Sequence, residues 1–369
     1  MDTIPTEVLR DVLSRCSEYA PILKEICYEW NEILSNTSSN QVVLSFEKMA
    51  DRGNINLLKY IGKDRISEKR ISHILRHAAK GGHLNIMILA KKWGATNYDD
   101  ALNYAAKHGR IEAMYLTKEW GATEYDDALD GAAKGGQISA IHLLKKWGAI
   151  NYDRALISAA KNGQLPAMHL LKEWGATDYD WALIGAAETG QIPAMYLSKE
   201  WGATDYNFAL AIAAMSGQIL TSTLLKEWGA DDYNWALDSA AENGHLPVMR
   251  LLKEWGADDY DYALARAAMN GHLPAMHLLK EWGATDYDEA LKYAVLNGKI
   301  LAMHLVKEWG ATDYNKALKY AAGSGQISAM HLAKEWGATD YDNALLHGSH
   351  CNEAVELLTN WINYSPIPC

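Results

Sequence analysis

The chain has 369 residues, of which 49% are hydrophobic and 22% charged, and its formal net charge is -11 at pH 7. This negative charge argues against a nucleic-acid-binding surface, which needs clustered Lys and Arg side chains. No apolar run approaches the ~18 residues of a membrane span, and the N-terminus lacks the pattern of a signal peptide. None of the four cysteines forms a CxxC pair. We therefore expect no nucleic-acid or membrane partner and a reducing compartment, the cytoplasm, with the nucleus as an alternative.

Residues 1–40 differ in sequence from the rest of the chain. The helical spacing of Ile4, Val8 and Leu9 predicts a first helix, with Pro5 in its first turn. A second apolar face includes Ile26 and ends at Trp30. One interpretation is a small helical cap that covers the beginning of the array that follows.

The same residues resemble an F-box, a family that opens with Leu-Pro-x-Glu-Ile/Leu and closes with Val-Cys-x-x-Trp. Here residues 4–9 (Ile-Pro-Thr-Glu-Val-Leu) and residues 26–30 (Ile-Cys-Tyr-Glu-Trp) stand at those motifs, whereas residues 17–21 depart from the family's middle motif. The resemblance implies docking to a Skp-type subunit of a cullin ubiquitin ligase. The docking residues would be Pro5, Val8, Leu9, Leu13, Ile26 and Trp30.

A motif of Trp-Gly-Ala then returns every 27 residues, from Trp93 to Trp336, in ten copies. One copy of this length cannot bury enough apolar surface to offset the entropy lost on ordering it, so the copies must stack. We predict a degenerate capping repeat at 41–70, ten repeats at 71–340, and a C-terminal capping repeat and tail at 341–369.

Each copy contains the pattern of two short helices. In the copy that begins at Tyr98, Asp99 is predicted to cap the first helix, and Gly109 to end it. The first helix should bury Leu102, Ala105 and Ala106.

The second helix of the same copy should bury Ala113, Leu116 and Trp120, flanked by Met114. We predict that the tryptophan of each copy continues this buried face and acts as a staple. Full burial of its ring would contribute about 4–6 kcal/mol.

The pattern Ala-Ala-x-x-Gly-His-Leu, followed by Leu-Leu and Gly-Ala, resembles the ankyrin repeat, and residues 161–165 and 244–246 match it closely. Each copy is about six residues shorter than the ~33 of that family. The missing residues fall between Ala95 and Asp99, where the family has its β-hairpin. The resemblance implies an all-α solenoid of 27-residue ankyrin-like helix-turn-helix repeats without the hairpin, behind a small helical N-terminal cap. The near-unchanged wording also resembles arrays encoded by giant DNA viruses of amoebae, which implies the host cytoplasm.

Recurrent histidines suggest no chemistry. One column holds His142, His169, His277, His304 and His331. Neighbouring repeats lie about 10 Å apart, whereas a zinc ligand lies about 2 Å from its ion, so equivalent histidines cannot share one. No Ser/His/Asp grouping or phosphate-binding loop stands out, and we predict no catalytic residue, no metal, no cofactor and no enzyme.

The copies differ most at their third position, where four consecutive copies carry an aromatic residue: Trp181, Phe208, Trp235 and Tyr262. In ankyrin arrays this edge borders the concave, partner-binding surface. Exposed rings at repeat spacing would form a ladder for a protein target, extended by Ile212 and Arg266. Alternatively, the rings fold back to fill the space left by the absent hairpins.

The sequence therefore predicts a protein–protein interaction module. The first hypothesis is a substrate-recruiting adaptor of a Skp/cullin-type ubiquitin ligase. The alternatives are an ankyrin-type binding scaffold without a ubiquitin link, and a virion or assembly structural protein.

Overall fold

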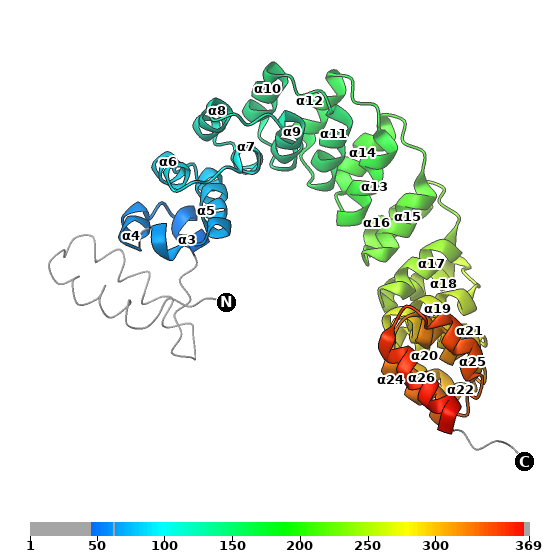
Figure 1. Cartoon of the computed structure of the whole chain (residues 1–369). Helices are drawn as coiled ribbons and strands as arrows, with labels where there is room; N and C mark the ends of the chain where they lie inside the picture. The colour runs from blue at the N-terminus through cyan, green and yellow to red at the C-terminus, as the bar shows by residue number, and fades with distance from the viewer. Residues whose placement is uncertain (1–45, 62, 365–369) are drawn as a thin grey trace, which may run out of the picture. The chain divides into compact units, whose positions relative to one another are not determined.

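A computed structural model describes residues 46–61 and 63–364 of the chain. Within these residues every element is a helix, and no strand occurs (Figure 1). The chain divides into two compact units, one comprising residues up to Ala155 with His169–Gly175, the other Leu156–Met168 with the residues from Ala176 onward. In each unit helix pairs recur at 27-residue spacing, which confirms the predicted all-α array without β-hairpins.

The helices of the first unit are α3 (Phe46–Asp51), α4 (Ile55–Ile61), the 3-10 helix η2 (Lys63–Arg65), α5 (Glu68–Gly81), α6 (Leu84–Lys92), α7 (Tyr98–Lys107), α8 (Ile111–Glu119), α9 (Tyr125–Lys134) and α10 (Ile138–Trp147). Residues of α11 (Tyr152–Lys161) and α12 (Leu165–Glu173) are divided between the units. The helices of the second unit are α13 (Tyr179–Thr189), α14 (Ile192–Glu200), α15 (Tyr206–Met215), α16 (Ile219–Glu227), α17 (Tyr233–Glu242), α18 (Leu246–Trp255), α19 (Tyr260–Asn270), α20 (Leu273–Trp282), α21 (Tyr287–Leu296), α22 (Ile300–Trp309), α23 (Tyr314–Gly323), α24 (Ile327–Glu335), α25 (Tyr341–His347) and α26 (Asn352–Tyr364).

Within each unit, first helices of successive pairs pack closely on one another, as α7 does on α9 and α15 on α17. In α7 the residues Ala101, Leu102, Ala105 and Ala106 are fully buried, which confirms the predicted face. Alanine at three of these four positions lets the helices approach closely. Second helices contact one another much less.

The buried face of the second helices is rotated from the predicted one. In α8 the buried residues are Ala113, Met114 and Thr117, whereas Leu116 and Trp120 are only half-buried. The hydroxyl group of Thr117 donates to backbone carbonyl oxygens of its own helix, so its burial leaves no donor unpaired. The spacing of apolar residues in the sequence does not distinguish fully buried positions from half-buried positions at the edge of the core, which we call the rim.

The repeated tryptophans lie on this rim. The ring of Trp120 packs on Tyr98 of its own repeat, with ring centroids 5.5 Å apart. The Nζ of Lys91, from the preceding repeat, lies 4.6 Å from the Trp120 ring centroid. The tryptophan therefore links two repeats through aromatic and cation–π contacts, and it does not lie on the predicted buried face. Because the ring is half-buried, its contribution falls below that of full burial.

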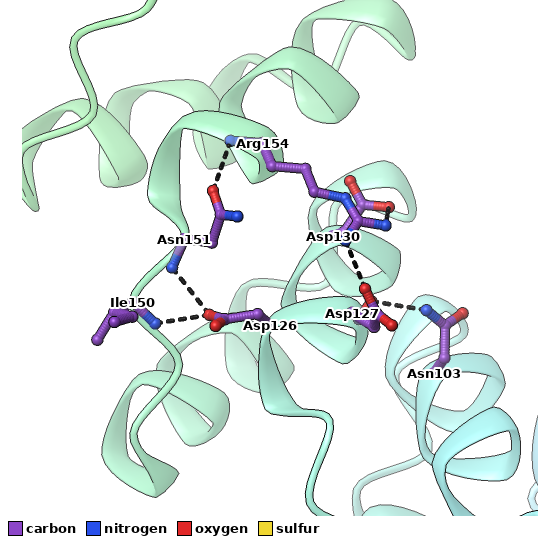
Figure 2. Close-up of polar contacts among 7 residues, drawn as sticks. All are labelled: Asn103, Asp126, Asp127, Asp130, Ile150, Asn151 and Arg154. Atoms are coloured by element: carbon purple, nitrogen blue, oxygen red, sulfur yellow. Dashed lines mark hydrogen bonds and ion pairs between the residues drawn. The ribbon is translucent and has the colours of Figure 1, made fainter.

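Helix ends follow the predicted glycines, but the Asx residues at the second repeat position act differently from the prediction. Gly109 adopts a left-handed conformation (φ 67°) at the end of α7. Asp126, in the first turn of α9, accepts hydrogen bonds from the backbone N–H of Ile150 and Asn151 at 2.7 and 2.8 Å (Figure 2). Asp99 binds the amides of residues 123 and 124 in the same way.

These Asx side chains thus tie one first helix to the turn that leads into the next. The local N-cap is the residue before the helix instead: Asn151 Oδ1 accepts from the N–H of Arg154 at 3.2 Å. A residue already inside the first helical turn points its side chain away from the amides that need a cap. The prediction of capping by Asp99 and its equivalents is therefore wrong.

The last helix, α26, takes the place of a further repeat. Its Trp361 packs on His331 and Tyr341, with ring centroids 5.4 and 5.6 Å apart, as the repeat tryptophans do. Trp361 is buried.

Candidate functional site

The four aromatic residues at the third repeat position lie in the second unit, one turn into α13, α15, α17 and α19. Three of their backbone N–H groups are held by the aspartate that caps the helix. Phe208 donates to Asp205 at 3.2 Å. Equivalent bonds join Trp235 to Asp232 at 3.1 Å and Tyr262 to Asp259 at 3.2 Å.

Three of these rings form a continuous stack, which we call the aromatic ladder (Trp181, Phe208 and Trp235). The Trp181 and Phe208 centroids lie 5.5 Å apart, with planes at 80°. Those of Phe208 and Trp235 lie 5.3 Å apart, with planes at 10°. Both arrangements are favourable aromatic geometries.

The rings stay at the surface. Trp181, Trp235 and Tyr262 expose 49%, 43% and 41% of their surface, and Phe208 is half-buried between its two neighbours. They therefore do not fold back into the space of the absent hairpins. Their role in partner binding stays a prediction.

The helix at the centre of the ladder is the most apolar. No charged residue occurs in α15. Ile212 is half-buried on this helix, one turn after Phe208, and Met215 is exposed. On α13 the neighbouring Ile184 is buried and belongs to the core instead.

Tyr262 begins a polar region. Its hydroxyl oxygen accepts a hydrogen bond from Arg266 Nη2 at 2.8 Å, and the guanidinium carbon of Arg266 lies 5.1 Å from the Tyr262 ring centroid. Arg266 Nη1 also lies 3.6 Å from Glu242 Oε2 on α17. Of the two predicted extensions, Ile212 thus adds apolar surface, whereas Arg266 is engaged by two side chains.

Asp238 lies one turn after Trp235 and connects the two regions. Burial raises the pKa of its carboxyl group to about 7, and the charges of Asp259, Asp232 and Glu242 add to this effect, whereas Arg266 opposes it. Its Oδ1 atom is buried and accepts no hydrogen bond from the described residues. The repeat pattern gives no sign of the shifted pKa of Asp238 or of the charge of Glu242 beside it, because neither burial nor the charge around a carboxyl group is visible in a sequence.

The histidine columns serve packing. The ring of His142 lies edge-on to Trp174 with centroids 5.3 Å apart, and His277 packs on Trp309 in the same way. In the column that alternates His with Gln, Gln137 donates to the carbonyl oxygen of Gly135 at 2.9 Å, as a turn residue does. Among the described residues no group of His, Cys, Asp or Glu is arranged to hold a metal ion.

The residues of the F-box interpretation, Pro5, Val8, Leu9, Leu13, Ile26 and Trp30, all lie outside the described residues. Their docking role stays a prediction. Across residues 46–61 and 63–364, no helix has the length and apolar content needed to cross a membrane.

No family model matches the chain, and no curated protein matches it. Among solved structures, the chain is similar to the crystal structure of the human ASB11 ankyrin repeat domain. The identity is 20%, the match covers 50% of this chain and 99% of that one, and the TM-score is 0.39.

Proposed function

We propose that this protein is a binding scaffold whose second unit holds a protein partner against the faces of α13, α15, α17 and α19. The observation that carries the proposal is the aromatic ladder: Trp181 packs edge-to-face on Phe208, Trp235 stacks on it, and both tryptophans still expose almost half of their surface. Large aromatic side chains are the most frequent anchors of protein interfaces, because covering them removes much apolar area from water.

Two further features support this surface over others. The ladder is a contiguous row of aromatic rings, whereas Leu220 on α16 is an exposed aliphatic side chain of the same unit outside it. The three rings also pack against one another, so part of their side-chain freedom is lost before a partner binds.

The test is site-specific photo-crosslinking in an extract of the source cells. A photoreactive residue at position 208 should give discrete adducts with a partner. The same probe at position 100, which has the same place in a repeat of the first unit, is the control. Equal labelling at 208 and 100 would argue that the ladder only stabilises the fold.

A matched pair of variants sharpens the result. With the probe at 208, the double variant Trp181→Ala/Trp235→Ala should lose the adducts. Leu220→Ala removes an exposed apolar side chain of the same unit outside the ladder and should keep them. Adducts that survive in the ladder variant would contradict the proposal.

A second candidate function is recruitment of the bound partner to a ubiquitin ligase, and it is supported by the F-box resemblance of residues 1–40. In this function the N-terminal segment binds a Skp-type subunit while the repeats hold the target. Full-length protein should capture a purified Skp-type subunit, and Leu9→Asp/Trp30→Ala should abolish capture with the circular dichroism spectrum unchanged. Failure of the unmutated protein to bind would leave the scaffold function alone.

A further inference from the structure

The charges around the aromatic ladder are unevenly distributed. At the α13 end, the carboxylate of Glu188 is paired with Lys161, whose Nζ lies 2.6 and 2.7 Å from its two oxygens. The central helix α15 carries no charge. Apart from the aspartates at the helix starts, such as Asp180 and Asp205, the unbalanced charge beside the ladder lies at its far end, on α17 and α19.

That far end has an excess of negative charge. Four carboxyl groups gather there: the charges of Asp232, Glu242 and Asp259 act on Asp238, and Arg266 is the cation that opposes them. The guanidinium group of Arg266 is already shared between Glu242 and the Tyr262 hydroxyl group. One positive charge thus faces four acidic groups.

Asp238 is the least satisfied of these groups. Its Oδ1 atom is buried and, among the described residues, accepts no hydrogen bond. Burial and the neighbouring carboxylates hold its pKa near 7, so its ionised form is poorly stabilised in the free protein. A positive charge placed beside it would favour the ionised form and offset the repulsion.

An exposed aromatic ring stands next to this group. Trp235 precedes Asp238 by one helical turn, and 43% of its surface is accessible. A cation that lies over an indole face while it faces a carboxylate gains from both interactions.

We propose that the partner segment combines apolar and basic side chains: an apolar residue covers Trp181 and Phe208, and a Lys or Arg lies against Trp235 toward Asp238 and Glu242. This inference rests on the proposed binding function and adds the chemistry of the partner. A purely apolar segment would leave the acidic end unpaired, and an acidic segment would be repelled by it.

Synthetic peptides test this chemistry directly. The probes are three fluorescein-labelled peptides of the forms (Leu-Arg-Leu-Ser)3, (Leu-Gln-Leu-Ser)3 and (Leu-Glu-Leu-Ser)3, titrated with the full-length protein and followed by fluorescence anisotropy. We expect the Arg peptide to bind at least fivefold more tightly than the Gln peptide, and the Glu peptide to bind more weakly than both.

Variants separate local charge from the net charge of the chain. Asp238→Asn/Glu242→Gln should reduce the Arg-over-Gln preference to less than twofold while the Gln peptide binds as before. Glu200→Gln/Glu227→Gln changes the net charge equally at exposed positions on α14 and α16, and it should leave the preference intact.

The possible outcomes distinguish a failure of the basic-partner inference from a failure of the proposed binding function. An Arg peptide that binds no more tightly than the Gln peptide, including binding by neither, overturns the basic-partner inference. A preference that persists in Asp238→Asn/Glu242→Gln also overturns it. Crosslinking at position 208 judges the binding function independently, and adducts there with a second copy of this chain would assign the ladder to self-association.

Discussion

The third repeat position carries opposite kinds of surface in the first unit and in the repeats that begin the second unit, although later repeats of the second unit are polar there again, as at Glu289 and Lys316. In the first unit, Arg154 forms an ion pair with Asp127, and its Nη2 lies 3.8 Å from Asp130 Oδ2 (Figure 2). Asn103 extends this polar network by donating to the carbonyl oxygen of Asp127 at 2.6 Å. In the second unit the same position carries the aromatic ladder.

The difference shows which part of the repeat is free to vary. Leu129 in the first unit and Leu210 in the second occupy the same repeat position beneath these two surfaces, and both are fully buried. Packing therefore does not require either surface. In the first unit the polar groups satisfy one another, whereas in the second unit large apolar rings remain in contact with solvent, which is the arrangement expected of a surface that a partner covers.

The largest expected effect is a loss of stability when the core that both units share is disrupted. Leu129→Ala and Leu210→Ala should each lower the free energy of unfolding by about 2–5 kcal/mol, because each removes fully buried methyl groups and leaves a cavity. Urea denaturation followed by circular dichroism measures both. A loss below about 1 kcal/mol at one site only would show that the two cores are packed differently.

A second test concerns the Asx links, which both units share. Asp126→Ala removes the acceptor of two backbone N–H groups, and Asn207→Ala does the same for the amides of residues 231 and 232. Each should reduce the free energy of unfolding by about 1–2 kcal/mol in the same denaturation experiment.

Conservative exchanges at these positions should differ between the units. Asn207 also donates through Nδ2 to Asp231 Oδ1 at 3.0 Å, so Asn207→Asp would bring two carboxylates together. Asp126 only accepts from backbone amides, and Asp126→Asn keeps an oxygen acceptor. Equal stability of Asn207→Asp and the unmutated chain would contradict this assignment.

Much of the fold could be predicted because each repeat position has one backbone environment. The alternation of Leu102 with Ala105 and Ala106, and the left-handed Gly109, follow from local helix geometry. The error at Asp99 arose because its hydrogen-bond partners lie 24 and 25 residues away, in a turn whose position no local rule supplies. Trp120 is less buried than predicted. The apolar spacing of its helix does not show that the ring lies at the rim, against Lys91 of the preceding repeat.

The candidate site was less predictable than the fold. The spacing of Trp181, Phe208 and Trp235 identified the column, but their exposure depends on whether another element covers them. The sequence shows variation at Asp238, whereas its shifted pKa arises from burial and from carboxylates on two helices. Such properties depend on the three-dimensional surroundings of a residue.

A third test uses the carboxyl group of Asp238, whose counterpart at the same repeat position in the first unit is Asp130, which lies beside Arg154. Its pKa is raised from 3.8 to about 7 in the folded protein. Between these pH values the folded state binds more protons than the unfolded state, so this group lowers stability as pH rises, and the full penalty applies above pH 7. Asp238→Asn should therefore stabilise the protein at pH 8, by on the order of 1 kcal/mol after solvent screening.

The pH profile is the control for this effect. The stability difference between Asp238→Asn and the unmutated chain should shrink steadily as pH falls from 8 to 4, because Asp238 is then protonated in the folded state. Thermal unfolding in a series of buffers measures it. A difference that is independent of pH would mean that the substitution acts through packing.

The smallest expected effect compares the two surfaces directly, by double-mutant cycles on the pairs Phe208/Trp235 and Asp127/Arg154. The stacked rings should couple by about 0.5–1.5 kcal/mol, and the half-exposed ion pair by about 0.2–1 kcal/mol. Salt separates them: in 1 M NaCl the Debye length falls to about 3 Å, so the ion-pair coupling should decrease while the ring coupling persists. If the ring coupling disappeared in high salt, charges near the ladder, and not ring contact, would hold Phe208 and Trp235 together. That result would contradict the interpretation of the ladder as an apolar anchor for a partner.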